Sequence, residues 1–192
     1  MRILLLGPQG SGKGTQASKL AETYGIAHVA TGDMLRAAMA DGTELGRRIE
    51  PLYDNGELVP DDLMIELIRE RLGLDDTAEG FVLDGFPRTM AQARALDAML
   101  QELGRALSVV FELQVSDRMC VERLLRRAEI EGRTDDTEEA ILRRLRLYHE
   151  ETEPLVEYYR AQGNLVGIHA DRTVDEVFEE IQQALDEVLV RK

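Results

Sequence analysis

The sequence has a single cysteine, no signal-peptide pattern and no apolar run that approaches membrane-spanning length. One cysteine, Cys120, forms neither an internal disulfide nor a four-cysteine zinc site. Its neighbours Met119 and Val121 indicate a small helical residue rather than a nucleophile. Because no segment resembles a leader or a membrane span, we expect a cytoplasmic protein with no membrane partner.

Positive charge is also scarce, since 23 Lys and Arg stand against 37 Asp and Glu, for a formal net charge of −14. This balance disfavours nucleic acids and acidic membranes as partners. The 192 residues, 44% of them hydrophobic, suffice for a single domain with its own core. An acidic chain that binds an anion must gather its positive charge locally, so the positions of the arginines are informative.

Short apolar runs alternate with helical patterns along the chain. This alternation predicts an α/β fold, with a five-stranded parallel sheet covered by helices on both faces. The expected strands are Ile3–Leu6, Ala27–Val29, Phe81–Leu83, Val109–Leu113 and Leu165–Ile168.

Helix starts are marked by capping residues. Ser116 is expected to cap one helix, and Thr173 with Glu176 has the spacing of a capping box. Asp136 with Glu139 has the same spacing and predicts a third start.

Two stretches interrupt the alternation within the single domain of residues 1–192. Residues 30–59 hold helical patterns and predict a small helical lobe inserted between the second and third strands. Residues 128–137 are polar and charged. Composition alone favours a solvated loop between helices, and the alternative is a short mobile cover over a site.

Residues 7–15 read Gly-Pro-Gln-Gly-Ser-Gly-Lys-Gly-Thr and lie between the first apolar run and an amphipathic stretch. Strand, glycine-rich loop and helix form the context of a phosphate-binding loop, in which converging N–H groups, a helix N-terminus and a lysine hold an anion. The alternative, a glycine-rich turn that binds nothing, does not account for the lysine. We therefore predict a triphosphate site made by Gly10, Ser11, Gly12, Lys13, Gly14 and Thr15.

The magnesium anchor is expected outside this loop. Gly14 stands where a hydroxyl residue usually contacts Mg²⁺, and Thr15 comes one position too late, so we expect Thr15 to contact phosphate. Asp84 follows the third strand and would lie at the same sheet edge as the loop. We expect it to hold Mg²⁺ through water, although an aspartate that caps the turn before Gly85 explains its position equally well.

Arginines follow several strands. Arg88 comes four residues after Asp84, and Arg36 follows the second strand. A simple ATPase has one set of phosphates to hold, so two converging arginines suggest phosphoryl transfer between two nucleotides.

A second group of arginines follows the fourth strand. Arg123 and Arg127 share one helix face, Arg133 lies in the polar stretch and Arg144 lies on the next helix. Composition leaves open whether these side chains bind phosphate or balance acidic neighbours.

With these motifs the chain resembles the adenylate kinases of the nucleoside monophosphate kinase family, in their short-lid form, from Met1 to about Val190. The segments that carry the resemblance are residues 7–16, 31–36, 56–59 and 83–88, Gln92, Gly132-Arg133, Asp135-Asp136 and Arg144.

The resemblance implies the reaction MgATP + AMP ⇌ 2 ADP, which maintains the balance of adenine nucleotides. The implied fold is a P-loop nucleotide kinase with a nucleoside monophosphate-binding lobe and a lid too short for a zinc site. The implied partners are ATP, AMP and ADP, and we expect a monomer because both lobes must swing freely.

The resemblance also implies roles for the matching positions. Gln92 would read the adenine edge of AMP, Arg123 would pack on the adenine of ATP, and Asp135 would orient the lid arginines. The implied catalytic residues are Lys13, Asp84, Arg88, Arg123, Arg133 and Arg144. The implied ATP site comprises residues 10–15, Arg123, Arg127 and Arg172. The implied AMP site comprises Thr31, Arg36, Glu57, Val59, Gly85, Arg88, Gln92, Arg133 and Arg144.

Two departures from the family pattern are Ala30, where serine is usual, and Pro8-Gln9, and we expect each to shift affinity rather than abolish activity. The nearest rival is a UMP/CMP kinase, against which Thr31 and Gln92 argue. A nucleotide-dependent switch is the rival from another class, but the chain has no Asn-Lys-x-Asp guanine motif.

The chemistry needs no general base, because an AMP phosphate is already ionised at neutral pH. The three histidines are accordingly interpreted as structural or surface residues. They are His28, His149 and His169.

Overall fold

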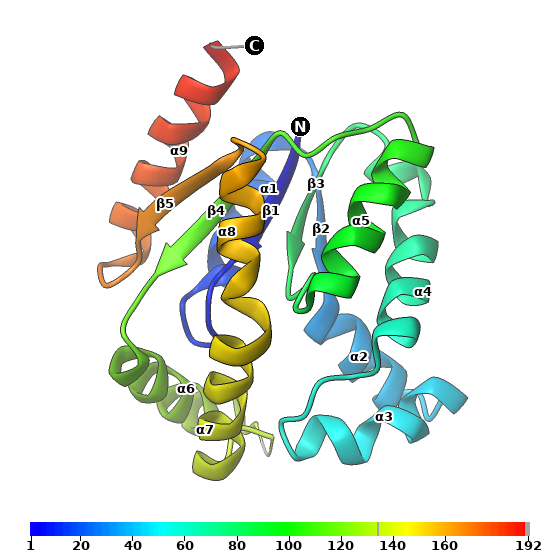
Figure 1. The fold of residues 1–192 in the computed structure, drawn as a ribbon. Helices are drawn as coiled ribbons and strands as arrows, with labels where there is room; N and C mark the ends of the chain where they lie inside the picture. Colours follow the sequence, from blue (N-terminus) through cyan, green and yellow to red (C-terminus); the bar gives the residue numbers. More distant parts are fainter. Residues whose placement is uncertain (134, 191–192) are drawn as a thin grey trace.

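The computed structural model describes residues 1–133 and 135–190, which form one parallel sheet with helices on both of its faces (Figure 1). The strand order is β2-β3-β1-β4-β5, and every pairing is parallel. The predicted five-stranded fold is confirmed, and each strand is one residue longer than its apolar run. The strands are β1 (Arg2–Leu6), β2 (Ala27–Ala30), β3 (Phe81–Asp84), β4 (Val109–Gln114) and β5 (Leu165–His169).

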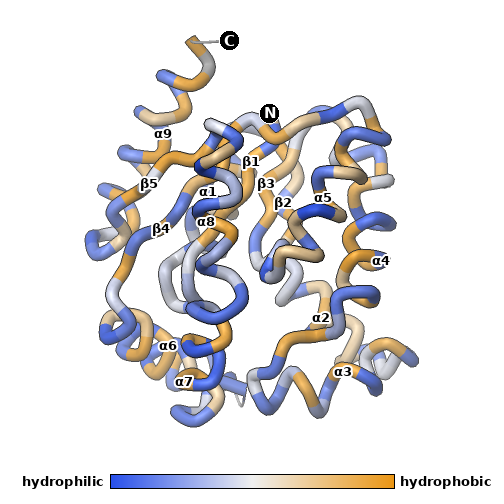
Figure 2. The backbone as a smooth tube through the Cα atoms, in the orientation of Figure 1, coloured by the Kyte–Doolittle hydropathy of each residue, from blue (hydrophilic) through white to orange (hydrophobic). Residues whose placement is uncertain are grey.

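Alternate side chains of the strands enter two separate cores, as the two-residue period of a strand requires. Ile3 and Leu5 of β1 pack with helices α1 (Lys13–Tyr24) and α9 (Val174–Val190). Leu4 and Leu6 belong to the core on the other face. That core is completed by α4 (Asp61–Leu72), α5 (Met90–Glu102) and α8 (Pro154–Ala161). Figure 2 shows the strands as largely hydrophobic, whereas the outer helices mix hydrophobic and hydrophilic residues.

Two short helices follow β2 and lie beyond the carboxyl end of the sheet (Figure 1). They are α2 (Thr31–Ala40) and α3 (Glu44–Asp54). Thr43 caps α3 by accepting a hydrogen bond from the amide of Gly46. Gly46 allows the two helices to touch, because a Cβ at this position would lie 2.1 Å from the carbonyl oxygen of Ala38. The stretch expected to be a helical lobe is therefore helical.

A helical hairpin follows β4. It consists of α6 (Asp117–Glu131) and α7 (Glu138–Leu147), and a π-helical turn, η2 (Tyr148–Thr152), leads from α7 into α8. Because α6 continues to Glu131, the expected loop of residues 128–137 is wrong at its start, and its first four residues are helical. The remaining element is the 3₁₀ turn η1 (Asp75–Thr77).

The predicted helix caps are confirmed at two of three positions. Ser116 accepts from the amide of Met119, and Thr173 exchanges hydrogen bonds with Glu176 as a capping box does. The cap expected at Asp136 is wrong: Thr137 caps α7 by accepting from the amide of Ala140. None of the helices in the described part of the chain is long and apolar enough to cross a bilayer.

Candidate functional site

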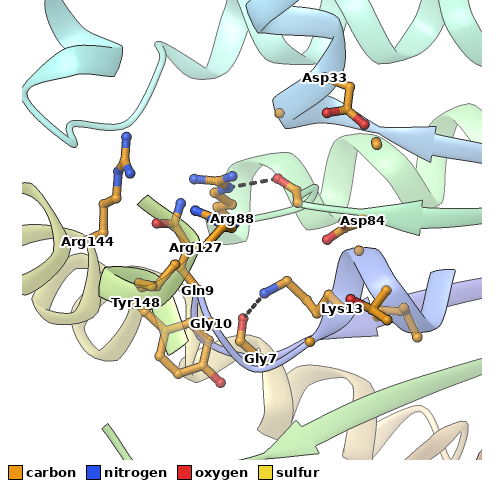
Figure 3. Close-up of a pocket in the computed structure, with 18 of the residues that line it drawn as sticks. Gly7, Gln9, Gly10, Lys13, Asp33, Asp84, Arg88, Arg127, Arg144 and Tyr148 are labelled. Atoms are coloured by element: carbon orange, nitrogen blue, oxygen red, sulfur yellow. Dashed lines mark hydrogen bonds between the residues drawn. The ribbon is translucent and has the colours of Figure 1, made fainter. Parts of the chain in front are cut away.

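A cavity of about 540 Å³ opens beyond the carboxyl ends of β1 and β3. Residues from the glycine-rich loop, from α2 and α3, and from the α6–α7 hairpin line it, so segments far apart in the sequence meet around one space (Figure 3). Its position is the one that an open parallel sheet offers to ligands.

The glycine-rich loop wraps back on its own lysine. Lys13 Nζ donates a hydrogen bond to the carbonyl oxygen of Gly7 at 2.7 Å (Figure 3). It donates a second one to the carbonyl oxygen of Pro8 at 2.8 Å. Gly10 has a φ of +83°, and a Cβ there would lie 2.7 Å from the carbonyl oxygen of Cys120. Glycine is therefore required for the loop to pack against α6.

Burial lowers the pKa of Lys13 to about 8, and the neighbouring Arg88 acts in the same direction while Asp84 opposes it. The site is thus arranged around an ammonium group that lacks enough negative charge nearby. An anionic ligand would supply that charge and stabilise the protonated form.

Asp84 ends β3 and faces the first turn of α1. A Cβ on Gly14 would lie 3.3 Å from Asp84 Oδ2, so the glycine at this position leaves the space beside the carboxylate open. Asp84 also lines the cavity. The sequence placed this carboxylate at the same sheet edge as the loop, and the structure confirms that placement.

Arg88 is held by the turn that follows β3. Its Nε donates to the carbonyl oxygen of Gly85 at 2.8 Å, and Thr152 Oγ1 donates to the carbonyl oxygen of Arg88 at 2.8 Å. Gly85 has a φ of +85°, and a Cβ there would lie 2.4 Å from Thr31 Oγ1 and 3.2 Å from Arg88 Nη2. Burial lowers the pKa of Arg88, so an anionic ligand beside this guanidinium would stabilise its charged form.

Arg36 reaches the cavity from α2. Its guanidinium pairs with Asp33 and donates through Nη1 to Tyr53 Oη at 2.5 Å. Tyr53 belongs to α3, so the two helices are joined by this contact at the edge of the cavity.

A buried carboxylate joins the arginines of the helical hairpin. Asp136, whose side chain is fully buried, accepts from Arg127 Nη2 at 2.6 Å and from Arg144 Nη1 at 2.8 Å. Asp135 also pairs with Arg144, at 3.1 Å. Asp136 could not serve as the cap of α7, because its carboxylate is committed to these two guanidinium groups.

Arg123 and Arg133 line the cavity from the same side. Arg123 Nη2 donates to the carbonyl oxygen of Ala170 at 2.9 Å, and Arg133 Nε pairs with Glu131 at 2.6 Å. The cavity therefore brings together most of the predicted site residues. They are Gly10, Gly12, Lys13, Gly14, Thr15, Arg36, Asp84, Gly85, Arg88, Arg123, Arg127, Arg133 and Arg144.

Six predicted residues do not line this cavity: Ser11, Thr31, Glu57, Val59, Gln92 and Arg172. The carboxamide of Gln92 is engaged on both sides, because its Oε1 accepts from the Arg88 amide and its Nε2 donates to Asp61, each at 2.8 Å. Glu57 pairs with Arg143 at 3.0 Å, and Arg172 pairs with Glu180. Their expected contacts with a nucleotide stay predictions.

Sequence reasoning missed two tyrosines that line the cavity, Tyr53 and Tyr148. Burial raises the pKa of Tyr148, so its hydroxyl is neutral. Neither tyrosine carries a local signal, because each reaches the cavity through the packing of helices. Asp61, which orients Gln92, was missed for the same reason.

Comparison with known proteins gives a consistent result. The family model described as adenylate kinase matches residues 5–164. The chain is 52% identical over 183 residues to an adenylate kinase of Thermus thermophilus, a match that covers 95% of this chain and 96% of the relative. It is 46% identical to an adenylate kinase of Stenotrophomonas maltophilia, covering 96% and 99% of the two chains. An adenylate kinase of Xanthomonas euvesicatoria is 45% identical with the same coverage.

Proposed function

The chain belongs to the adenylate kinase family, and from that premise we propose which residues carry the transfer. As a member it is an enzyme that binds ATP, AMP and ADP and converts ATP and AMP into two ADP. The observation that carries our assignment is that Lys13 and Arg88 line one cavity and that burial lowers the pKa of both cations. Among the described residues neither forms an ion pair with a carboxylate, so both cations are available to phosphate.

The two nucleotides occupy opposite ends of this cavity. The phosphates of ATP lie on the amides of residues 10–15 and on Lys13, with Arg123 and Arg127 on the hairpin side. The phosphate of AMP lies between Arg36 and Arg88. Support for this division comes from the elements that carry the residues, since the loop and α6 supply one set, and α2 and the turn after β3 supply the other.

The reaction then follows from position and charge. An oxygen of the AMP phosphate attacks the γ-phosphorus of ATP, the bond from that phosphorus to the bridging oxygen breaks, and ADP leaves. The AMP phosphate has a second pKa of about 6 and is ionised at pH 7, so no side chain has to accept a proton. Lys13, Arg88, Arg133 and Arg144 neutralise the charge that spreads over the transferring group.

The donor is MgATP, as in the family, and Asp84 is the residue that would hold the metal through water. Its carboxylate lies beside Lys13 at the open space left by Gly14, and Mg²⁺ favours one or two carboxylates together with water and phosphate oxygens. The residues therefore fit the ion, which when bound would draw charge from the phosphates.

Two segments would close over the nucleotides. We propose residues 30–59 as the lobe that covers AMP and residues 128–137 as the lid that covers ATP. Closure of both would exclude water, which otherwise competes as an acceptor for the γ-phosphate. We further propose that the enzyme works as a monomer without structural zinc, because each cover swings on the same core.

The test is ³¹P NMR of the purified protein with MgATP and, in turn, AMP, UMP, CMP, GMP or no acceptor. We expect rapid ADP formation with AMP alone. The test variant is Lys13→Met, for which the rate should fall by about 10²–10³-fold. The matched control is Lys19→Met, which alters a half-buried lysine paired with Asp175 outside the cavity and should leave the rate unchanged. Equal rates with UMP or CMP would contradict the preference for AMP, and ATP hydrolysis indifferent to any acceptor would contradict the kinase function.

A further inference from the structure

We propose that Tyr53 is a positioning residue that ties the AMP-side arginine, Arg36, to the lid-side arginine, Arg144. This inference rests on the proposed roles of those two arginines and adds a residue that the sequence did not single out. Tyr53 lines the cavity and packs against the core that contains Leu4 and Leu6.

The hydroxyl of Tyr53 orients the guanidinium of Arg36. Arg36 Nη1 donates to Tyr53 Oη at 2.5 Å, while Nη2 of the same guanidinium pairs with Asp33. Two partners on different helices hold the planar group from two sides. The orientation of the fork matters because a guanidinium binds phosphate through two parallel N–H groups.

The ring and the backbone carbonyl of Tyr53 contact the guanidinium of Arg144. The guanidinium carbon of Arg144 lies 5.4 Å from the centre of the Tyr53 ring, within the range of a cation–π contact. Arg144 Nη2 also donates to the carbonyl oxygen of Tyr53 at 3.0 Å. The same arginine is held from its other side by Asp135 and Asp136.

Tyr53 thereby closes a continuous chain of contacts across the cavity. The chain runs from Arg36 through Tyr53 to Arg144, and from there through Asp136 to Arg127. Gly56 extends the contact between α3 and α7, since a Cβ there would lie 2.8 Å from the carbonyl oxygen of Ala140. The lobe and the hairpin meet directly at this point, so the spacing of the two arginines depends on Tyr53.

Two substitutions distinguish the contribution of the Tyr53 hydroxyl from that of its ring. Tyr53→Phe removes only the hydroxyl, and we expect the KM for AMP to rise about three- to tenfold with kcat and the KM for MgATP unchanged. Tyr53→Leu also removes the ring, and we expect kcat to fall a further two- to fivefold, roughly. Tyr158→Phe is the matched control, because the Tyr158 hydroxyl bonds to Asp97 at 2.6 Å outside the cavity.

A cycle with Arg36→Met distinguishes positioning from a general structural role. If the hydroxyl acts through the guanidinium, Tyr53→Phe raises the KM for AMP no further once Arg36 is methionine. Additive effects in the double variant would overturn the proposal, as would a Tyr53→Phe enzyme with the wild-type KM for AMP. In both cases the proposed function stands, provided that Arg36→Met by itself weakens AMP binding. A wild-type protein that makes no ADP from ATP and AMP, or an Arg36→Met variant with unchanged KM, overturns the proposed function as well.

Discussion

Single residues give the cavity a charge opposite to that of the chain. Among the residues that the structure describes, seven cationic side chains and four carboxylates line it, although the chain as a whole carries a formal charge of −14. Backbone carbonyl oxygens hold the cationic group of Lys13 in place, and the buried carboxylate of Asp136 holds those of Arg127 and Arg144. Local placement, not overall composition, makes this protein able to bind polyanions.

Lys13 gives a prediction about pH. Its pKa is lowered to about 8 in the free protein, and bound phosphates should raise it. Binding of MgATP at pH 8.5 should therefore take up about 0.7 proton, but less than about 0.1 at pH 7, where Lys13 is already charged. Calorimetry in two buffers of different ionisation enthalpy measures this uptake. The same heats in both buffers at pH 8.5 would contradict it.

The lowered pKa of Lys13 also makes the free energy of unfolding depend on pH. Because the folded pKa of Lys13 lies below the unfolded value of 10.5, the unfolded chain binds more protons between about pH 8 and 10.5. Lys13 alone therefore makes the free protein more stable as pH rises through that window. Lys13→Met should remove both this slope and the proton uptake.

Asp136 gives a prediction about stability. Asp136→Asn keeps the shape but leaves Arg144, whose side chain is 7% exposed, with the carboxylate of Asp135 alone. We expect the free energy of unfolding to fall by about 3 kcal/mol, the lower end for breaking a buried pair. Urea unfolding measures the change.

The control for Asp136 is Glu131→Gln. Glu131 pairs with Arg133 but is 47% exposed, so the loss should stay below about 1 kcal/mol. An Asp136→Asn protein as stable as this control would show that the buried network adds little.

At the scale of elements, the sequence correctly predicted the helix starts whose capping hydrogen bonds are local. Ser116 and the pair Thr173–Glu176 act within one turn, so their spacing sufficed. Asp136 has the same spacing with Glu139, but a contact nine residues away with Arg127 outweighs the local one. The start of α7 moved by one residue as a result.

His149 gives a prediction for the junction of α6 and η2. Its ring contacts Glu153 at 2.9 Å and Asp117, in the first turn of α6, at 3.0 Å. The hydrogen bond to Glu153 has the largest effect and raises the pKa of His149; burial opposes it, and the hydrogen bond to Asp117 adds to the rise.

The stabilisation is therefore fully present below the unfolded pKa of 6.5 and is lost as pH rises through the folded value. We expect His149→Gln to lower the urea midpoint at pH 5.5 and to leave it nearly unchanged at pH 8.5. A loss of the same size at both pH values would show that the ring acts by packing alone.

On the scale of the whole molecule, the two proposed nucleotide sites would each stabilise the same fold when occupied. Each ligand that binds only the folded state at about 100 times its Kd stabilises it by about 2.7 kcal/mol. For a chain of this length that corresponds to a rise in Tm of about 5–10 °C.

Substitutions at each site should remove the rise in Tm that is caused by the nucleotide bound there. We expect Arg36→Met to lose the shift given by AMP while keeping that of MgATP, and Lys13→Met to show the reverse. Differential scanning calorimetry with each nucleotide alone measures both. Loss of both shifts in either variant would indicate one shared site.

The sequence alone determined the fold, the glycine-rich loop and the position of Lys13, Arg36 and Arg88 at one sheet edge, whereas the arginines of the hairpin were expected at the site only from the family resemblance. It could do so because these features are written in short-range patterns: apolar runs, glycine spacing, and charged residues directly after strands. The carboxyl ends of parallel strands meet at one edge, so the sequence suffices to place Lys13, Asp84, Arg88 and Arg36 together.

Tertiary structure alone decided which groups hold those cations. Asp136 lies behind Arg127 and Arg144 rather than capping α7, and Gln92 faces Asp61 and the Arg88 amide rather than the cavity. Tyr53 meets Arg144, 91 residues away. Such contacts depend on how helices pack across the sheet edge, and no spacing within the chain encodes that packing.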